Sequence, residues 1–182
     1  MKNTMSHILR LSLALMLVIT CFLLLPTDVQ AATVASGTSG AAITWTLDDN
    51  GTLTITGSGK MANSDWGNST PWYEYNQSIT KVIVDDGITA IGDFAFIDCD
   101  NLTQVQLADS VTEIGELAFR RCRSLTSISI PHKVTEIAYS TFNECTALKS
   151  VDLPSSLVSI QRSAFENCTA LETISISKML HT

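Results

Sequence analysis

The chain has 182 residues, of which 45% are hydrophobic and 16% are charged, and its formal net charge at pH 7 is −7. This length suits one domain of ordinary size behind a short leader. The acidic balance argues against nucleic-acid binding and against attachment to anionic membranes, because both need clustered Lys and Arg side chains.

Residues 1–31 have the organisation of a secretory signal peptide. A basic start is followed by an almost unbroken apolar run from Leu11 to Leu25, and a small-residue cleavage pattern ends at Ala31. The run is short for a membrane span. A lipoprotein signal around Cys21 fits less well, because its neighbours are bulky. Cleavage leaves residues 32–182 with 9 basic and 17 acidic side chains, a net charge of −8, so we expect a secreted, extracellular or cell-surface protein with no membrane span of its own.

The next two segments are expected to form a flexible linker, residues 32–40, and an N-terminal β-hairpin cap, residues 41–67. Two runs of alternating apolar and polar residues flank Asp48-Asp49-Asn50-Gly51. Asn-Gly at this position predicts a hairpin with a type I′ turn. Cap packing is the preferred role of the nearby aromatic rings, and a sugar-binding platform is the alternative. These rings belong to Trp45, Trp66, Trp72 and Tyr73.

Residues 91–182 are one 23-residue unit written four times. Three columns recur at the same spacing: Phe96, Phe119, Phe142 and Phe165; Cys99, Cys122, Cys145 and Cys168; Leu102, Leu125, Leu148 and Leu171. A fixed period of roughly 20–29 residues with an L-x-x-[IV]-x-[LI] core is typical of leucine-rich repeats. Residues 68–90 fit the same phasing as a degenerate first repeat, with Tyr73 in the Phe column and Ile79 in the Leu column.

The pattern within one repeat predicts the shape of each coil. Ser127 to Ile130 alternates and is expected to be a strand that ends at Pro131, which cannot donate to a ladder. Glu116 to Cys122 is expected to be a short helical turn. The fold class is therefore a right-handed leucine-rich repeat solenoid with a parallel β-sheet on one face and short helical turns opposite. The last repeat is expected to be uncapped, so that residues 172–176 form an open edge available for self-association.

The four repeat cysteines are expected to be free thiols buried in the core. Each occupies the same place in its repeat, between the Phe and Leu columns, and buried Cys behaves as a small hydrophobe. A disulfide between neighbouring turns is the alternative, because stacked positions lie about 5 Å apart. The spacing contains no Cys-x-x-Cys pair that would indicate zinc, and we expect neither a metal nor another cofactor.

The outward positions of the predicted sheet are the candidate binding face, because they vary between repeats while the core columns do not. These positions are Gln104, Gln106, Ser127, Ser129, Ser150, Asp152, Thr173 and Ser175. A solvated face without a partner is the alternative interpretation.

Two further groups of polar residues are expected to carry no chemistry. The cluster Arg120, Arg121 and Arg123 lies one repeat away from acidic residues, and it is expected to form ion pairs with them rather than to bind phosphate. Those acids are Asp98, Asp100 and Glu144. Behind the leader, His132 and His181 have no nucleophile or carboxylate at a spacing typical of acid–base catalysis, so the chain is not expected to be an enzyme.

The repeat has the form I-G-x-x-A-F-x-x-C-x-x-L-x-x-I-x-I-P-x-x-V, with Cys three residues before Leu. This form resembles the BspA-like leucine-rich repeat family of bacterial surface and secreted proteins. The segment TWTLDDNGTLTITGSGKM is similar to one that often precedes such repeats. The third repeat departs from the form at Ala138 and Thr141.

The resemblance implies an adhesin-like, non-catalytic module that binds a host matrix protein or another cell-surface protein, with a glycan as the less favoured ligand. Alternatives are a structural unit that assembles through its open C-terminal edge, and a shortened member of a longer repeat array.

Overall fold

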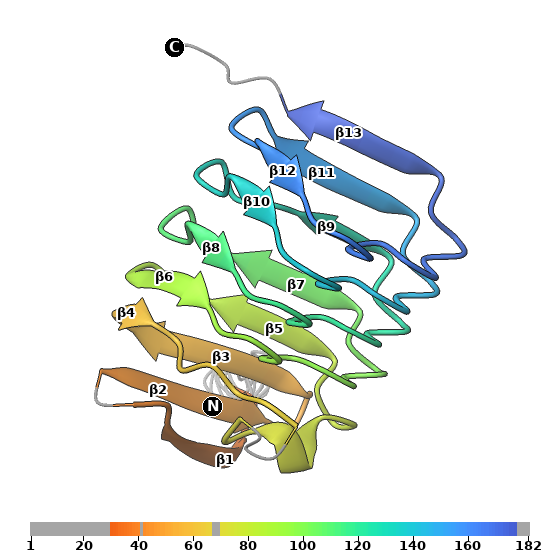
Figure 1. The fold of residues 1–182 in the computed structure, drawn as a ribbon. Helices are drawn as coiled ribbons and strands as arrows, with labels where there is room; N and C mark the ends of the chain where they lie inside the picture. The colour runs from red at the N-terminus through yellow and green to blue at the C-terminus, as the bar shows by residue number, and fades with distance from the viewer. Residues whose placement is uncertain (1–29, 41, 67–69, 178–182) are drawn as a thin grey trace, which may run out of the picture. The chain divides into compact units, whose positions relative to one another are not determined.

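The computed structural model describes residues 30–40, 42–66 and 70–177 (Figure 1). Residues 1–29 of the expected signal peptide lie outside the described residues. Residues from Ala31 onward form a compact unit of their own, and it is a solenoid in which one coil stacks on the next. The main face carries β5 (Lys81–Val84), β7 (Gln104–Leu107), β9 (Ser127–Ser129), β11 (Ser150–Pro154) and β13 (Thr173–Ser177). The second face carries β4 (Gly59–Lys60), β6 (Ile88–Ile91), β8 (Glu113–Ile114), β10 (Glu136–Ile137) and β12 (Ser159–Ile160).

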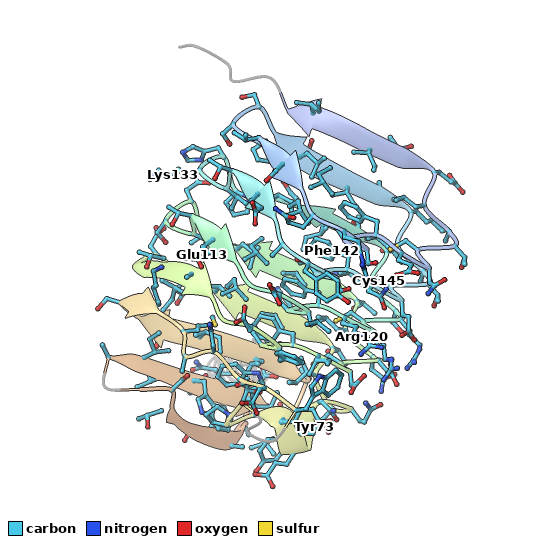
Figure 2. The ribbon with its side chains drawn as sticks, in the orientation of Figure 1. Tyr73, Glu113, Arg120, Lys133, Phe142 and Cys145 are labelled. Carbon is cyan, nitrogen blue, oxygen red and sulfur yellow. The ribbon has the colours of Figure 1, made fainter. Side chains whose placement is uncertain are left out.

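A column of stacked aromatic rings forms the centre of the core. Phe96, Phe119 and Phe142 are at most 1% exposed, and successive ring centroids are 5.2 and 5.5 Å apart. The stack continues to Phe165 at 5.4 Å. Figure 2 shows Phe142 and Cys145 inside the coil. The Phe and Leu columns of the sequence therefore face the core, as predicted.

The N-terminal end contains two strands more than the sequence suggested, one of which is β4. β2 (Ile43–Asp48) and β3 (Thr52–Gly57) pair antiparallel, as expected of the hairpin, and β3 then pairs in parallel with β5. β1 (Thr33–Thr38) pairs antiparallel with β2. The prediction of a flexible linker over residues 32–40 was therefore wrong, because these small residues complete the edge of the sheet.

The hairpin turn also differs from the prediction. Asn50 does not take a positive φ, whereas Gly51 does, at 78°. A type I′ turn needs positive φ at both central residues, so the turn is of another type. Gly51 donates its N–H to the Asp48 carbonyl at 3.1 Å, and the Asp48 carboxylate accepts the N–H groups of Asn50 and Thr52.

The degenerate first repeat uses a different aromatic residue from the expected one. Trp72 is 1% exposed and stacks on Phe96 at 6.0 Å, whereas Tyr73 opens the short 3-10 helix η1 (Tyr73–Tyr75) and is 37% exposed. The Trp72 indole N–H donates to the Ala95 carbonyl at 2.7 Å. In the next coil the equivalent carbonyl, that of Ala118, accepts the Phe96 N–H. The Trp72 indole thus takes the place of two groups of a regular coil, the stacked phenylalanine ring and the backbone N–H that donates to the neighbouring coil.

The segments expected to be short helical turns are not helical. Within residues 116–122, Leu117 and Arg121 have φ values of 54° and 62°, which lie in the left-handed region. Residues at alternate positions donate their N–H groups to backbone carbonyls of the next coil. Phe119, for example, donates to the Thr141 carbonyl at 2.9 Å. The residues between them form local turns, as Cys122 does with the Phe119 carbonyl. We call this row of segments, residues 93–99, 116–122, 139–145 and 162–168, the turn edge.

The main-face strands do not form one continuous sheet. β7 belongs to a five-stranded sheet with β1, β2, β3 and β5, whereas β9 belongs to a three-stranded sheet with β11 and β13. Among the described strands, β7 and β9 are not hydrogen-bonded neighbours, and neither are β8 and β10. The turn edge, by contrast, stays hydrogen-bonded across the same seam.

Candidate interaction surfaces

The eight predicted binding residues all lie on the main face, but the seam divides them. Gln104 and Gln106 are exposed on β7. The other six are in register on β9, β11 and β13, as Ser127↔Ser150↔Thr173 and Ser129↔Asp152↔Ser175. The Ser175 hydroxyl is 3.0 Å from the Asp152 carboxylate. The structure therefore brings six of the residues together on one sheet and places the two glutamines across the break.

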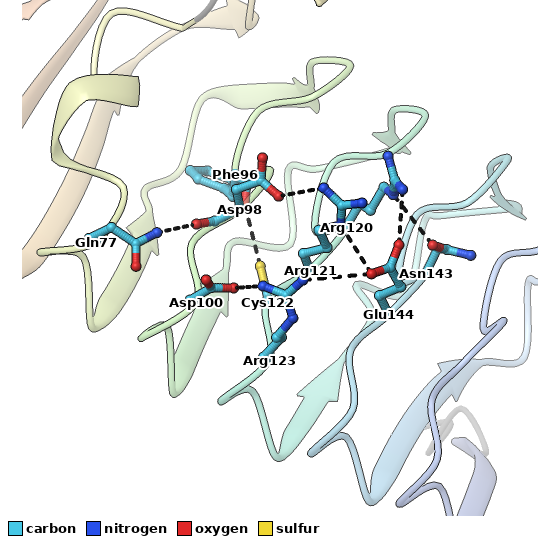
Figure 3. Close-up of polar contacts among 10 residues, drawn as sticks. All are labelled: Gln77, Phe96, Asp98, Asp100, Arg120, Arg121, Cys122, Arg123, Asn143 and Glu144. Carbon is cyan, nitrogen blue, oxygen red and sulfur yellow. Dashed lines mark hydrogen bonds and ion pairs between the residues drawn. The ribbon is translucent and has the colours of Figure 1, made fainter.

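The arginine cluster forms the ion pairs that the sequence predicted (Figure 3). The Glu144 carboxylate accepts the Arg120 guanidinium at 2.9 Å and that of Arg121 at 3.0 Å. These hydrogen bonds hold the pKa of the Glu144 carboxyl below its usual range and raise the pKa of Arg121. Arg121 also reaches Asp98 at 3.5 Å, and Arg123 reaches Asp100 at 2.6 Å. The cluster thus links three successive coils at the turn edge.

The repeat cysteines are free thiols with a structural role. Cys99, Cys122 and Cys145 are buried, and Cys168 is half-buried. The Cys122 thiol donates to the Phe96 carbonyl at 3.3 Å, and the Cys145 and Cys168 thiols make the same contact one and two coils later. Burial raises the pKa of all four thiols. The protonated, donating form is therefore the stable one, and the column binds successive coils together.

The remaining polar groups include one exposed histidine. Exposed His132 lies 3.2 Å from Asp109, with which it bridges the seam. Among the described residues, no three His, Cys, Asp or Glu side chains gather as a metal site would require. In the same part of the chain, no helix is long and apolar enough to cross a membrane.

Two hollows on the surface were not foreseen from the sequence. One, of about 370 Å³, lies over the seam and includes Gln106, Ser129 and His132 in its lining. The other, of about 410 Å³, lies at the turn edge, and we call it the aromatic groove. Its lining is Trp66, Leu117, Arg120, Tyr139, Ser140, Asn143, Glu144, Glu166 and Asn167.

Trp66 is the residue that sequence reasoning misplaced. It was expected in the N-terminal core, yet its side chain is 68% exposed. Its ring meets Phe94 edge-on at 5.1 Å, and the Arg120 guanidinium lies 5.5 Å from its centre. A sequence signal existed for Tyr139: its column holds charged Asp93, Glu116 and Arg162 in the other repeats.

Comparison with known protein families agrees with the repeated coils of this structure. Residues 71–182 match the family described as BspA type leucine rich repeat region, in six copies. The chain belongs to this family. No protein of curated function matches it.

Solved structures of leucine-rich repeat proteins from bacteria have a similar fold. One from Eubacterium ventriosum is 30% identical with a TM-score of 0.63, and the match covers 79% of this chain and 44% of that protein. One from Bacteroides ovatus is 29% identical with a TM-score of 0.56, covering 68% of this chain and 36% of that protein. The T. pallidum leucine-rich repeat protein is 27% identical with a TM-score of 0.55, covering 71% and 66%. The chain therefore spans less than half of the first two of these leucine-rich repeat proteins.

Proposed function

We propose that this BspA-type repeat protein is an exported, adhesin-like module that binds a host matrix protein or another cell-surface protein without catalysis. The observation that carries the proposal is the main face, where outward polar side chains repeat in register on β9, β11 and β13. Parallel rows of variable side chains on a rigid solenoid form an extended surface of the kind that repeat proteins use for binding. The leader-like residues 1–31 support export.

The polar character of the face suits a modest, specific contact. The six outward residues of β9, β11 and β13 include four hydroxyls of Ser, one of Thr and the Asp152 carboxylate. Trp, Tyr and Arg, which dominate the binding energy of tight interfaces, are missing from these positions. We therefore expect a partner that is matched by many hydrogen bonds rather than by one apolar anchor, and an affinity that depends on the whole face.

The test uses immobilised matrix proteins and bacterial surface extracts, from which a bound protein is identified and then purified. The triple variant Gln104→Ala, Gln106→Ala and Asp152→Ala is expected to weaken its binding, as measured by surface plasmon resonance. A matched triple variant on the second face is expected to bind normally: Glu113→Ala, Thr135→Ala and Gln161→Ala. Unchanged affinity of the first variant would rule out the main face. N-terminal sequencing of the exported product checks the leader, with Ala32 as the expected first residue.

A second candidate function, assembly with another copy, is favoured by the last described coil. Ile174 and Ile176 on β13 are 47% and 67% exposed, and Val158 and Ile160 are 84% and 49% exposed. The column mates of Ile174, such as Ile128 and Val151, are at most 4% exposed. An open strand edge beside apolar side chains favours strand pairing between molecules. Sedimentation velocity over a range of concentrations tests this function, and a strict monomer would exclude it.

A further inference from the structure

The aromatic groove contains an exposed tryptophan that its neighbours hold in place. Trp66 lies between the edge contact with Phe94 and the guanidinium of Arg120, so its position is fixed although most of its surface meets solvent. Tyr139, which is 39% exposed, lines the same hollow from the third repeat. Large aromatic rings left in water at a fixed position are typical of binding sites rather than of inert surface.

The size and lining of the groove indicate a small polar ligand. Its volume of about 410 Å³ lies within the roughly 300–1,000 Å³ usual for small-molecule sites. The lining also includes the amides of Asn143 and Asn167 and the carboxylate of Glu166. Leu117 is the only aliphatic side chain among the described residues of the lining, and it is itself just 8% exposed. The groove thus offers flat rings and hydrogen-bonding groups but no deep apolar pocket.

The charges of the groove are already paired in a way that disfavours ions. Arg120 is the only basic residue among the described residues of the groove. It donates to Glu144 at 2.9 Å and to the Asn143 amide oxygen at 3.4 Å. The Asn143 amide nitrogen donates to Glu166 at 3.3 Å. An anionic ligand would meet two carboxylates and no unpaired cation. A cationic ligand would compete with Arg120 for the face of Trp66.

We propose that the aromatic groove binds a neutral saccharide. The C–H face of a pyranose ring is apolar and flat, and it would pack against Trp66 or Tyr139. Its hydroxyls both donate and accept, which suits the carboxylate of Glu166 and the amides of Asn143 and Asn167. An apolar peptide side chain would find no depth to fill. The groove draws on Trp66 and on the turn edge, so it shares no residue with the main face of the proposed function. In Figure 2, Arg120 lies at the edge of the coil away from Glu113 and Lys133.

The three tryptophans make the groove directly observable. Trp45 and Trp72 are 5% and 1% exposed, whereas Trp66 is 68% exposed. A ligand that covers Trp66 should therefore shift the tryptophan emission to shorter wavelength, and acrylamide should quench that emission less. The probes are the neutral oligomers cellohexaose, maltohexaose and mannohexaose, together with an oligogalacturonate as the anionic comparison.

We expect at least one neutral oligomer to give a saturable shift, and calorimetry to give the same affinity. Trp66→Ala should weaken this binding by about tenfold or more, the usual effect of losing an aromatic anchor. Tyr139→Ala and Glu166→Gln should each weaken it severalfold. Gln106→Ala on the main face should leave it unchanged, and circular dichroism checks that each variant is folded.

Three results would overturn the proposal. One is the absence of saturable binding by all three neutral oligomers at millimolar concentration, and another is binding of the oligogalacturonate alone. The third is saccharide binding that survives Trp66→Ala and Tyr139→Ala in folded protein. If no saccharide binds and Trp66→Ala instead weakens a protein complex, the groove is a protein-binding site. Loss of the main-face interaction in Gln106→Ala leaves the saccharide result unaffected, so failures of the two proposals are distinguishable.

Discussion

The cysteine column shows how one residue type satisfies two demands at the same position. The site between Phe and Leu columns is fully buried at Cys122 and Cys145, so it needs a small apolar side chain. It also faces a backbone carbonyl of the preceding coil, at 3.3 Å from Cys122 and 3.1 Å from Cys145. A thiol is small, apolar and a weak donor. The column therefore favours Cys over Ala, which lacks a donor.

The raised pKa of the buried thiols predicts a stability that falls in alkali. An unfolded thiol ionises near pH 8.5, whereas burial raises the pKa of Cys99, Cys122 and Cys145 in the folded state. Above the unfolded pKa the native state binds more protons than the unfolded state, so the free energy of unfolding falls as the pH rises. At one pH unit above the unfolded pKa, each buried thiol should lower the free energy of unfolding by about 1.4 kcal/mol.

The measurement is urea unfolding in the presence of a reductant, near neutral pH and near pH 9.5. Cys122→Ala has one buried thiol fewer, and its loss of stability between the two pH values should be correspondingly smaller. Equal losses in the parent protein and the variant would show that the thiols do not cause the pH dependence.

Glu144 illustrates how much a single carboxylate can organise at the surface. It accepts hydrogen bonds from Arg120 and Arg121 and lies 3.6 Å from Arg123. Exposed pairs are usually worth no more than about 1 kcal/mol each. Their effect here is to hold the turn edge together at the seam, where the sheets do not bridge the coils.

At the scale of the element, the turn edge explains why a helix was the wrong prediction. The sequence from Glu116 to Cys122 has a helical spacing of apolar residues, yet Leu117 and Arg121 take positive φ. Left-handed backbone costs roughly 1–2 kcal/mol per residue. The cost is offset because the alternate N–H groups reach the carbonyls of the next coil. A single repeat cannot reveal this, since the acceptors belong to another repeat.

Substitution by glycine distinguishes a helix from the left-handed turn. Ser163 has a φ of 61° and is half-buried. In a helix Ser163→Gly would lower stability, because Gly is the poorest helix former after Pro. In the left-handed turn we expect Ser163→Gly to leave stability unchanged or to raise it by up to about 1 kcal/mol, since Gly has no Cβ strain there.

Ala164→Gly is the matched control at the neighbouring position. Ala164 is 2% exposed and is absent from the positive-φ residues, so its substitution should lower stability by about 1 kcal/mol. Urea unfolding measures both variants. A loss of stability in Ser163→Gly equal to that in Ala164→Gly would contradict the left-handed assignment.

At the scale of the whole molecule, the seam separates the described strands of each face into two hydrogen-bonded sets, which the turn edge still joins. Ala108 donates its N–H to the Val84 carbonyl at 3.1 Å, but the equivalent residue of the next coil is Pro131, which has no N–H. Val105 and Leu107 beside the seam are half-buried, whereas Val82 and Val84 are fully buried. Proline at this corner therefore removes one backbone hydrogen bond between the coils, whereas Pro154 in the same column leaves β9 and β11 paired.

The seam predicts locally fast amide exchange. Thr103 and Lys149 each donate to the preceding coil at 2.8 Å, whereas Thr126, in the same column between them, makes no such bond in the described structure. Losing one backbone hydrogen bond, worth about 0.5–1.5 kcal/mol, should speed exchange roughly two- to tenfold. Residue-resolved NMR exchange checks this, with Thr103 and Lys149 as internal controls. Equal protection at all three positions would mean that the sheets are continuous in solution.

The sequence by itself determined the fold class, the core and the ion pairs of this BspA-type chain. A 23-residue period places equivalent residues one coil apart, so Phe119 stacks on its column mates and Arg121 meets Asp98 and Glu144 without further information. The period predicts which residues of successive repeats lie next to one another, and these contacts join residues of that kind.

Only the tertiary structure decided what breaks the period. It placed Trp66 on the surface against Phe94 and Arg120, recruited residues 33–38 into the sheet and separated β7 from β9. These features join residues at different positions of different repeats, and their geometry depends on where the irregular N-terminal segment and the backbone hydrogen bonds come to lie in space. The aromatic groove arises in this way, because its Trp66 lies outside the repeats and becomes a neighbour of Tyr139 only when the coils stack.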